Sequence, residues 1–191
     1  MAANLSLYSI SGFVALDTDG NRVLAKYYKH KNAPAPLHDG KAFSSLKDQR
    51  TFEKGLWEKT KKAGGDIILY ESHLVLYKHS LDLIFYLIGP ATENEIMLHA
   101  ALQGFYDAVS LLLRNQVEKR SILENLDMVL LCLDETIDDG IIIETDSTAI
   151  ASRVSRPRAD TTDIVINEQV QTIMSAYQTV KERIQSRVAS F

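Results

Sequence analysis

The amino-acid sequence predicts an α+β fold, in which a five-stranded antiparallel sheet packs against helices. The first observation is the order of the segments: two β-rich runs, an amphipathic helix, three more β-rich runs and then apolar helices. The second is that short links join the β-rich runs, as they do between antiparallel neighbours. Strands and helices that are segregated in this way build layers around one core.

The composition limits the class of protein. Of 191 residues, 46% are hydrophobic and 24% are charged, which is typical of a soluble globular protein. A formal net charge of −4 argues against a nucleic-acid-binding protein, which normally has a basic face. With one cysteine, Cys132, the chain forms no internal disulfide and suits a reducing compartment.

The sequence lacks the signals of secretion and of membrane insertion. The first residues, MAANLSLYSISGF, have neither a basic n-region nor a continuous apolar h-region. The longest apolar run, residues 83–88, is far shorter than the roughly 20 residues that span a bilayer. The sequence therefore predicts a cytosolic protein whose membrane contact is peripheral.

The first two predicted strands, residues 5–17 and 22–30, are joined by the segment DTDGN. Its alternating oxygen ligands suggest a calcium loop, but an EF-hand loop starting at Asp17 needs glycine at its sixth position and glutamate at its twelfth. Arg22 and Tyr28 hold those positions. Asp-Gly between two β-rich runs is instead a strong signal of a hairpin with a type I′ turn. We therefore expect a turn and no calcium site.

The next predicted elements complete the sheet. Residues 32–40 contain two prolines and a glycine, which predicts a loop. Between residues 44 and 63 charged and apolar residues alternate at helical spacing, which predicts an amphipathic helix. Three β-rich runs, at 66–70, 73–79 and 83–88, then predict a meander that continues the sheet in sequence.

Apolar helices are predicted after the sheet. The segment TENE has the pattern of a capping box, in which Thr92 caps the amide of Glu95, and it opens a helix that extends to about residue 115. Another helix is predicted at residues 121–136, and a short one at 148–154. Residues 1–154 are expected to form one domain.

The end of the chain is predicted to be a separate element. Residues 155–165 are a polar linker, and residues 166–191 an amphipathic helix. Apolar residues recur every three or four positions along it: Ile166, Val170, Ile173, Tyr177, Val180, Ile184 and Val188. Since an isolated helix is marginal in water, this stripe is expected to pack on the domain or on a partner.

The sequence has no pattern of a catalytic, nucleotide-binding or metal site. Cys132 lies in the apolar run MVLLCL, where a thiolate is not stabilised, so we expect it to be buried. His73 and His79 lie on one face of a strand but roughly 20 Å apart, too far to share a metal. We therefore expect a protein that is not an enzyme and needs no cofactor.

One charge cluster is not explained by local structure. Four carboxylates, those of Asp134, Glu135, Asp138 and Asp139, stand at the end of a predicted helix. The helix dipole disfavours negative charge there by about 0.3–1 kcal/mol per group, and i,i+4 pairs within the set repel. Two interpretations stay open: a solvated acidic end, or a surface that faces basic residues of a partner.

Three segments of the chain carry a family pattern. RVLAKYY resembles the L-A-K-x-Y strand of the small chains of clathrin adaptors and coatomer. FYLIGPATENEIML is similar to the strand-to-helix junction of that family, and LDETIDDGIIIET to its D-E-x-x-D-x-G-x-x-x-E-T segment. The segments occur in family order within residues 5 to about 154. The resemblance implies the longin fold, a five-stranded antiparallel sheet with one helix on one face and two on the other, and a protein that is not an enzyme.

Within that family the chain is most similar to the coatomer zeta branch, because of its C-terminal extension and the E-N-E junction. The resemblance implies a coat (COPI) subunit, cradled by the large subunit gamma-COP within the heptameric coatomer, in retrograde Golgi-to-endoplasmic-reticulum and intra-Golgi transport. It also implies a cytoplasmic protein that is peripheral on the Golgi membrane and on COPI-coated vesicles. No nucleic acid and no small-molecule substrate is expected.

Two alternatives remain. One is another longin-type trafficking protein, such as a clathrin adaptor sigma-like subunit, a SNARE or a tethering-complex subunit; the other is an enzyme on an α+β scaffold. Sigma chains help to bind acidic dileucine signals with a basic residue directly before L-A-K. Val23 holds that position here and Arg22 comes one residue earlier, so its side chain is expected on the other face of the strand. We therefore do not expect cargo-signal recognition.

The C-terminal helix yields a first test. Ile173, Tyr177, Val180 and Ile184 are the expected contact residues of its apolar stripe, and replacing Ile173 and Val180 by Asp should undock the helix, because each change leaves an unpaired charge in an apolar contact. Hydrogen exchange should then become fast along residues 167–190. Fast exchange there in the unmodified chain, both alone and with its partner, would show that the helix docks nowhere.

Overall fold

The structure, a computed structural model, describes residues 7–28, 43, 45–62 and 66–155. The predicted loop at 32–40, the linker beyond residue 155 and the helix at 166–191 lie outside these residues. The described elements are, in chain order, β1 (Gly12–Asp17), β2 (Arg22–Tyr27), α1 (Leu46–Thr60), β3 (Ile67–Tyr70), β4 (His73–His79), β5 (Leu83–Pro90), α2 (Glu95–Leu112), α3 (Lys119–Glu124), α4 (Leu126–Thr136), β6 (Ile137–Asp138), β7 (Ile141–Ile142) and α5 (Ser147–Val154).

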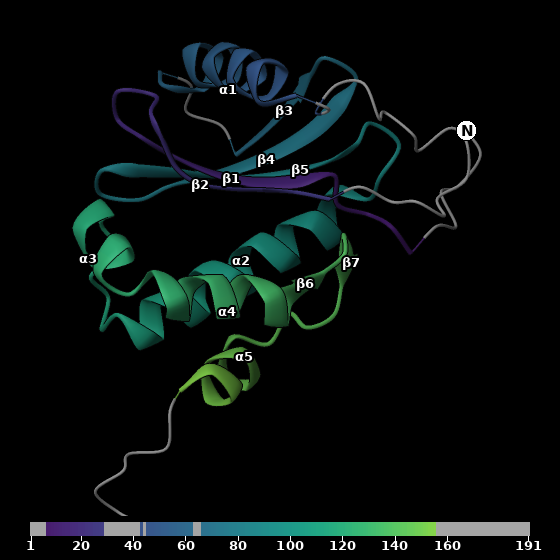
Figure 1. The fold of residues 1–191 in the computed structure, drawn as a ribbon. Helices are drawn as coiled ribbons and strands as arrows, with labels where there is room; N and C mark the ends of the chain where they lie inside the picture. The colour runs from purple at the N-terminus through teal and green to yellow at the C-terminus, as the bar shows by residue number, and fades with distance from the viewer. Residues whose placement is uncertain (1–6, 29–42, 44, 63–65, 156–191) are drawn as a thin grey trace, which may run out of the picture. The chain divides into compact units, whose positions relative to one another are not determined.

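Five strands form one antiparallel sheet in the order β2-β1-β5-β4-β3. Figure 1 shows α1 on one face of this sheet, and α2 and α4 on the other. The predicted α+β fold, with helices on both faces of the sheet, is confirmed. The expectation that the strands are neighbours in sequence order is wrong, because β1 lies between β2 and β5. Every residue of β1 is buried, and a strand with no polar face is stable at the centre of a covered sheet.

The two central strands divide the core into two clusters. Successive side chains of a strand point to opposite faces of the sheet. Phe13 therefore packs on the α2 side, where its ring centroid lies 4.7 Å from that of Phe105. Val14 and Tyr86 belong to the cluster under α1. The Tyr86 hydroxyl, which is buried there, forms a 2.7 Å hydrogen bond with the hydroxyl of Thr60.

Helix α1 is shorter than predicted at both ends. Ser45 is its N-cap, and the Ser45 hydroxyl accepts a 3.2 Å hydrogen bond from the amide of Asp48. Phe52 and Leu56 form its buried face against the sheet. The helix ends at Thr60, whose hydroxyl donates back to the carbonyl of Leu56.

The predicted hairpin is confirmed, but its turn is of another type. Gly20 has a φ of +81°, whereas Asp19 does not have the positive φ that a type I′ turn requires. The loop is one residue longer: the Gly20 amide donates a 3.0 Å hydrogen bond to the Asp17 carbonyl, and Gly20 itself lies in the left-handed region. The Asp17 carboxylate stabilises it by accepting hydrogen bonds from the amides of Asp19 (3.0 Å) and Asn21 (2.7 Å).

Two predictions about the helices are wrong in detail. The N-cap of α2 is Asn94 and not Thr92, since the Asn94 side chain accepts hydrogen bonds from the amides of Ile96 and Met97. The helix predicted at 121–136 is two helices, α3 and α4, which meet at Asn125. Backbone angles of −123° and 35° take Asn125 out of the helical region, and its side chain donates to the carbonyl of Ser121.

The turn between β3 and β4 suggests a stabilising substitution. Glu71 and Ser72 have φ values of 46° and 63°, the conformation of a type I′ turn, although neither residue is Gly or Asn. Ser72→Gly should raise the free energy of unfolding by about 1 kcal/mol, because glycine adopts positive φ without steric cost. Ser72→Ala keeps the β-carbon and should give no gain. Equal unfolding midpoints in denaturant for all three proteins would contradict strain at this turn.

Candidate functional site

The predicted acidic residues lie around the end of α4, but not on one helix. Asp134 and Glu135 belong to the last turn of α4, Asp138 to β6, and Asp139 to the turn that follows. The i,i+4 repulsion expected between Asp134 and Asp138 does not apply, because the α-helix ends at Thr136. We call Asp134, Glu135, Asp138 and Asp139 the acidic end.

A small hairpin, which sequence reasoning missed, presents the acidic end. Strand β6 pairs with β7, and Asp139 and Gly140 between them have φ values of 44° and 80°. This is the type I′ Asp-Gly turn that was expected at Asp19-Gly20. The carbonyl of Gly140 accepts 3.0 Å hydrogen bonds from the amides of Ser9 and Ile10, so the turn is tied to the segment that enters β1.

Cations of the chain itself neutralise half of the acidic end. The Lys26 ammonium of β2 forms an ion pair with Asp134. Arg153 of α5 lies 3.5 Å from the Glu135 carboxylate and 3.3 Å from that of Glu144. Such exposed pairs contribute only about 0–1 kcal/mol each to stability, but they leave less charge for a partner.

Asp138 and Asp139 are the unpaired members of the set. Both are exposed, and neither forms an ion pair with another residue in the described part of the chain. Tyr28 is close enough to feel their charge, and its buried hydroxyl has no hydrogen-bond partner among the described residues. Burial, and then the carboxylates of the acidic end, raise the pKa of Tyr28, so its hydroxyl stays protonated. Of the four carboxylates of the acidic end, only those of Asp138 and Asp139 therefore remain candidates for contact with a partner.

Arg22 is bound within the chain. In the antiparallel pairing of β1 with β2, Ala15 lies opposite Leu24, but the next residue, Leu16, lies opposite Arg22. Val23 is therefore an extra residue in β2. This bulge turns Arg22 toward α1, where its Nε and Nη2 donate to the two carboxylate oxygens of Glu53 at 2.9 and 2.6 Å. The Glu53 side chain is only 4% exposed. Arg22, one residue before the position that is basic in sigma chains, is thus held by Glu53.

Tyr27 completes this buried network. Its hydroxyl donates a 2.7 Å hydrogen bond to Glu53 Oε1, which also accepts from Arg22. Burial, and then the charge of Glu53, raise the pKa of Tyr27. The hydroxyl therefore remains a donor, and Glu53 has a partner on each side.

The other groups singled out in the sequence show no catalytic arrangement in the described residues. Cys132 is fully buried, as predicted, and burial raises the pKa of its thiol to about 12. His73 is buried in β4 and His79 is exposed. No group of three or more His, Cys, Asp or Glu residues suited to a metal ion occurs in the described segments. Within the same segments, no helix has the length and apolar character needed to cross a membrane.

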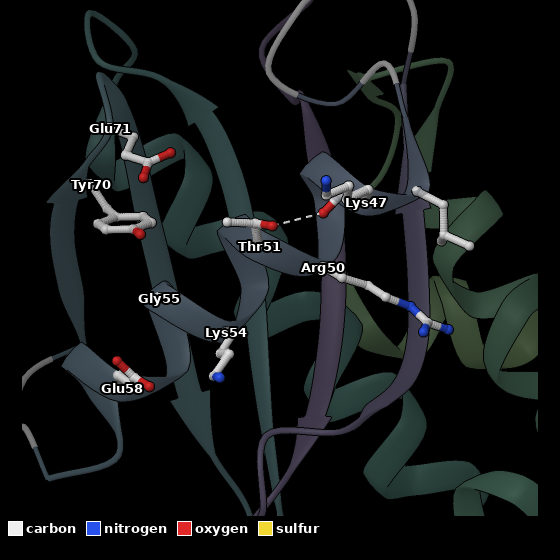
Figure 2. Close-up of a pocket in the computed structure, with 9 residues that line it drawn as sticks. Lys47, Arg50, Thr51, Lys54, Gly55, Glu58, Tyr70 and Glu71 are labelled. Carbon is white, nitrogen blue, oxygen red and sulfur yellow. Dashed lines mark hydrogen bonds between the residues drawn. The ribbon is translucent and has the colours of Figure 1, made fainter.

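A second surface, on the outer side of α1, was also missed. Lys47, Arg50 and Lys54 line a hollow of about 1020 Å³ there, together with Tyr70 at the end of β3 (Figure 2). The spacing of the three cations, i, i+3 and i+7, is the sequence signal that indicates a shared helix face.

The comparison with family models decides the classification. The model of the clathrin adaptor complex small chain matches residues 9–161. The chain belongs to the clathrin adaptor small-chain family. The match includes all three segments whose resemblance to this family is described above.

Relatives place the chain in the coatomer zeta branch of the family. It is 40% identical over 186 residues to coatomer subunit zeta of Saccharomyces cerevisiae, which covers 97% of each chain. It is 39% identical to coatomer subunit zeta-1 of Homo sapiens, over 94% of this chain and 92% of that one. It is 40% identical to coatomer subunit zeta-3 of Arabidopsis thaliana, over 92% and 91%.

A structural comparison supports the fold. A chain in a homology model of the full-length AP-3 complex, in a stretched open conformation, superimposes with a TM-score of 0.55 over 85% of this chain and 98% of that one. With 16% sequence identity, the likeness shows a shared longin-like fold alone.

Asp17 provides a test of the hairpin that is independent of partners. The carboxylate is 4% exposed and lies 2.9 Å from the Lys119 ammonium. Burial acts to raise the pKa of Asp17, but Lys119 and the loop amides outweigh it, so the pKa is lowered. A lowered pKa stabilises the fold above the unfolded-state pKa of about 3.9, and this contribution is lost as the pH falls through the folded-state value.

Asp17→Ala should therefore lower the free energy of unfolding at pH 7 by about 2 kcal/mol, since it removes charge-assisted hydrogen bonds. The difference from the unmodified chain should shrink below about pH 4. Asp19→Ala, at an exposed position of the same turn, should change stability by less than about 0.5 kcal/mol. A loss at Asp17 that does not depend on pH would contradict the assigned role of its charge.

Proposed function

We propose that the chain is a non-catalytic subunit of the coatomer (COPI) vesicle coat that pairs with gamma-COP. The observation that supports the proposal is the match to coatomer subunit zeta of Saccharomyces cerevisiae, 40% identical over 97% of both chains. A match of that length extends beyond the sheet domain into the C-terminal segment. We propose the same transport step for this chain, retrograde from the Golgi to the endoplasmic reticulum and within the Golgi.

The chemistry of the described residues suits binding rather than catalysis. The thiol of Cys132 is buried and protonated at neutral pH. The buried carboxylate of Glu53 is bound by Arg22 and Tyr27, so it is not available as a general base. The chain then acts by binding other proteins through its surface. Because Glu53 binds Arg22, this guanidinium is not available for an acidic cargo signal, which agrees with a role in binding gamma-COP.

The proposed contact with gamma-COP has a polar and an apolar part. The polar part is the acidic end, where Asp138 and Asp139 are exposed on a hairpin that is hydrogen-bonded to the segment before β1. A rigid pair of carboxylates loses little entropy on binding Lys or Arg of a partner. The apolar part is the C-terminal stripe with Ile173, Tyr177, Val180 and Ile184. An obligate interface of this kind buries roughly 2,000 Å² or more.

The proposed location follows from the proposed partner. Coatomer acts from the cytoplasm, so the chain is placed on the cytoplasmic side of the Golgi membrane and on COPI-coated vesicles. Its attachment is peripheral and is made through the complex.

Co-expression tests the proposed pairing. If the chain has an obligate partner, co-expression with gamma-COP should raise its solubility and its melting temperature together, because a ligand that binds only the folded state stabilises it. Co-expression with the large chain of a clathrin adaptor is the matched control and should change neither. A monodisperse isolated chain whose melting temperature is the same with and without gamma-COP would contradict the proposal.

Charge reversal tests the acidic end. Asp138→Lys with Asp139→Lys should slow association with gamma-COP and weaken the salt dependence of the association rate, as loss of complementary charge does. Asp138→Asn with Asp139→Asn should have a smaller effect in the same direction, and Asn tolerates the positive φ at position 139.

The control is Asp19→Lys with Glu124→Lys, two exposed positions with the same change in net charge. Association rates are measured by surface plasmon resonance at several salt concentrations. Equal rates for the Asp138/Asp139 variants and the control would contradict the proposed contact and would favour the alternative, a solvated acidic end.

A further inference from the structure

The hollow on α1 has features of a docking surface. It occupies about 1020 Å³ along the outer side of the helix, and Figure 2 shows Lys47, Arg50, Lys54, Gly55 and Tyr70 around it. Leu46, at the start of the helix, also lines the hollow and is 56% exposed. Charged and apolar side chains thus border one continuous depression.

Gly55, which also lines the hollow, allows the close approach of Tyr70 to α1. A β-carbon at position 55 would lie 2.1 Å from the hydroxyl oxygen of Tyr70, so any larger residue would displace the buried Tyr70 ring. Glycine inside a helix costs about 1 kcal/mol relative to alanine. Helix stability therefore does not explain glycine here, whereas the close approach of Tyr70 to α1 does.

The cations of the hollow form no ion pair within the described part of the chain. Lys47, Arg50 and Lys54, which we call the basic ridge, are exposed, and no ion pair joins them to another described residue. Among the described cations, ion pairs are formed by Arg22, Lys26, Lys119, Arg120 and Arg153, but not by Lys59, Lys61, Lys62, Lys78 and Arg114. The ridge differs from these other unpaired cations because its three members line one hollow from one helix. Arg50 and Lys54 also line a second hollow, of about 440 Å³, beside the β1–β2 turn. The ridge therefore separates two depressions.

We infer that the basic ridge docks an acidic segment of a partner protein, with its carboxylates over Arg50 and Lys54 and an apolar side chain against Leu46 and Tyr70. The inference goes beyond the proposed function, because α1 lies on the opposite face of the sheet from the acidic end (Figure 1). In a chain with a net charge of −4, such a local basic surface selects for acidic partners and speeds their encounter.

Acidic side chains at the same hollow favour a protein segment over a membrane surface. Glu58 and Glu71 line it together with the ridge. A continuous anionic surface would face these carboxylates as well as the cations, and like charges repel. A peptide can place its few carboxylates over the ridge alone. Its apolar side chains then meet Leu46 and Tyr70, as in the binding of amphipathic helices to grooves.

The test uses the full chain and a synthetic helix with glutamate on one face and leucine on the other. Binding is measured by fluorescence anisotropy at low and at physiological salt, and the contact is mapped by NMR shifts of backbone amides. Arg50→Glu with Lys54→Glu should weaken binding at least tenfold, which corresponds to about 1.4 kcal/mol. Thr51→Tyr fills the hollow without changing charge and should also weaken binding, which separates a shaped site from general attraction.

Matched controls decide the interpretation. Lys62→Glu with Arg114→Glu makes the same change in net charge at exposed positions outside the hollow, and this variant should bind like the unmodified chain. A helix with glutamine in place of glutamate should bind more weakly. Thermal melts establish that each variant is folded, and Arg50→Gln with Lys54→Gln replaces any variant that is not.

Four results would overturn the inference. The first is no binding of the glutamate helix, and the second is equal loss in the ridge variant and the Lys62/Arg114 control. The third is binding of phosphatidylserine vesicles that depends on the ridge while the helix is not bound, which would identify a lipid surface. The fourth is self-association of the chain that both the ridge variant and Asp138→Lys abolish, which would identify a second copy as the occupant.

Discussion

The structure depends on the burial of two central strands on both of their faces. All residues of β1, and those of β5 up to Gly89, are buried, so the sheet is stable only with a helical layer on each side. Helix α1 supplies one layer, and α2 with α4 supplies the other (Figure 1). Because both faces are covered from within the chain, the surfaces left for partners are the outer sides of these helices, the turns and the sheet edges.

Charge pairs also join the edge strand β2 to both helical layers. Arg22 binds Glu53 of α1, and Lys26 pairs with Asp134 of α4, so one strand is joined to both layers. The contact of Arg22 depends on the bulge at Val23. Arg22 and Lys26 are four residues apart and would share one face of a regular strand, whereas the extra residue turns Arg22 toward the opposite face. The same bulge directs Arg22 to Glu53, whereas Arg50 and Lys54 of the basic ridge, which line the same small hollow as Arg22, form no ion pair with a described residue.

The sequence predicted the kinds of elements well, because apolar period and β-rich composition are local signals. It located β4 to the residue and the other strands of the five-stranded sheet within a few residues at either end, apart from β1, which begins later, but it missed β6 and β7. Turn type was less predictable. Asp139-Gly140 forms the type I′ turn expected at Asp19-Gly20, and Glu71-Ser72 forms another without glycine or asparagine. Strand pairing and register decide which turn is formed, and these are properties of the whole sheet.

The candidate site was less predictable, because ion pairs join residues that are distant in sequence. The acidic cluster was visible as a composition, but its pairing with Lys26 and Arg153 was not. The break at Asn125 and the β6–β7 hairpin likewise depend on tertiary packing that overrides helix propensity. The three ordered segments identified the family correctly, because shared ancestry can be recognised from sequence without knowledge of any contact.

The most direct test of the central claim is recovery of the tagged full-length chain from cell extract, with quantitative mass spectrometry of the proteins bound to it. If the chain is a coatomer subunit, gamma-COP and the other coatomer subunits should be recovered in amounts equal to that of the tagged chain. Recovery with the large chains of a clathrin adaptor, with a tethering complex, or with no coat protein at all would contradict the claim.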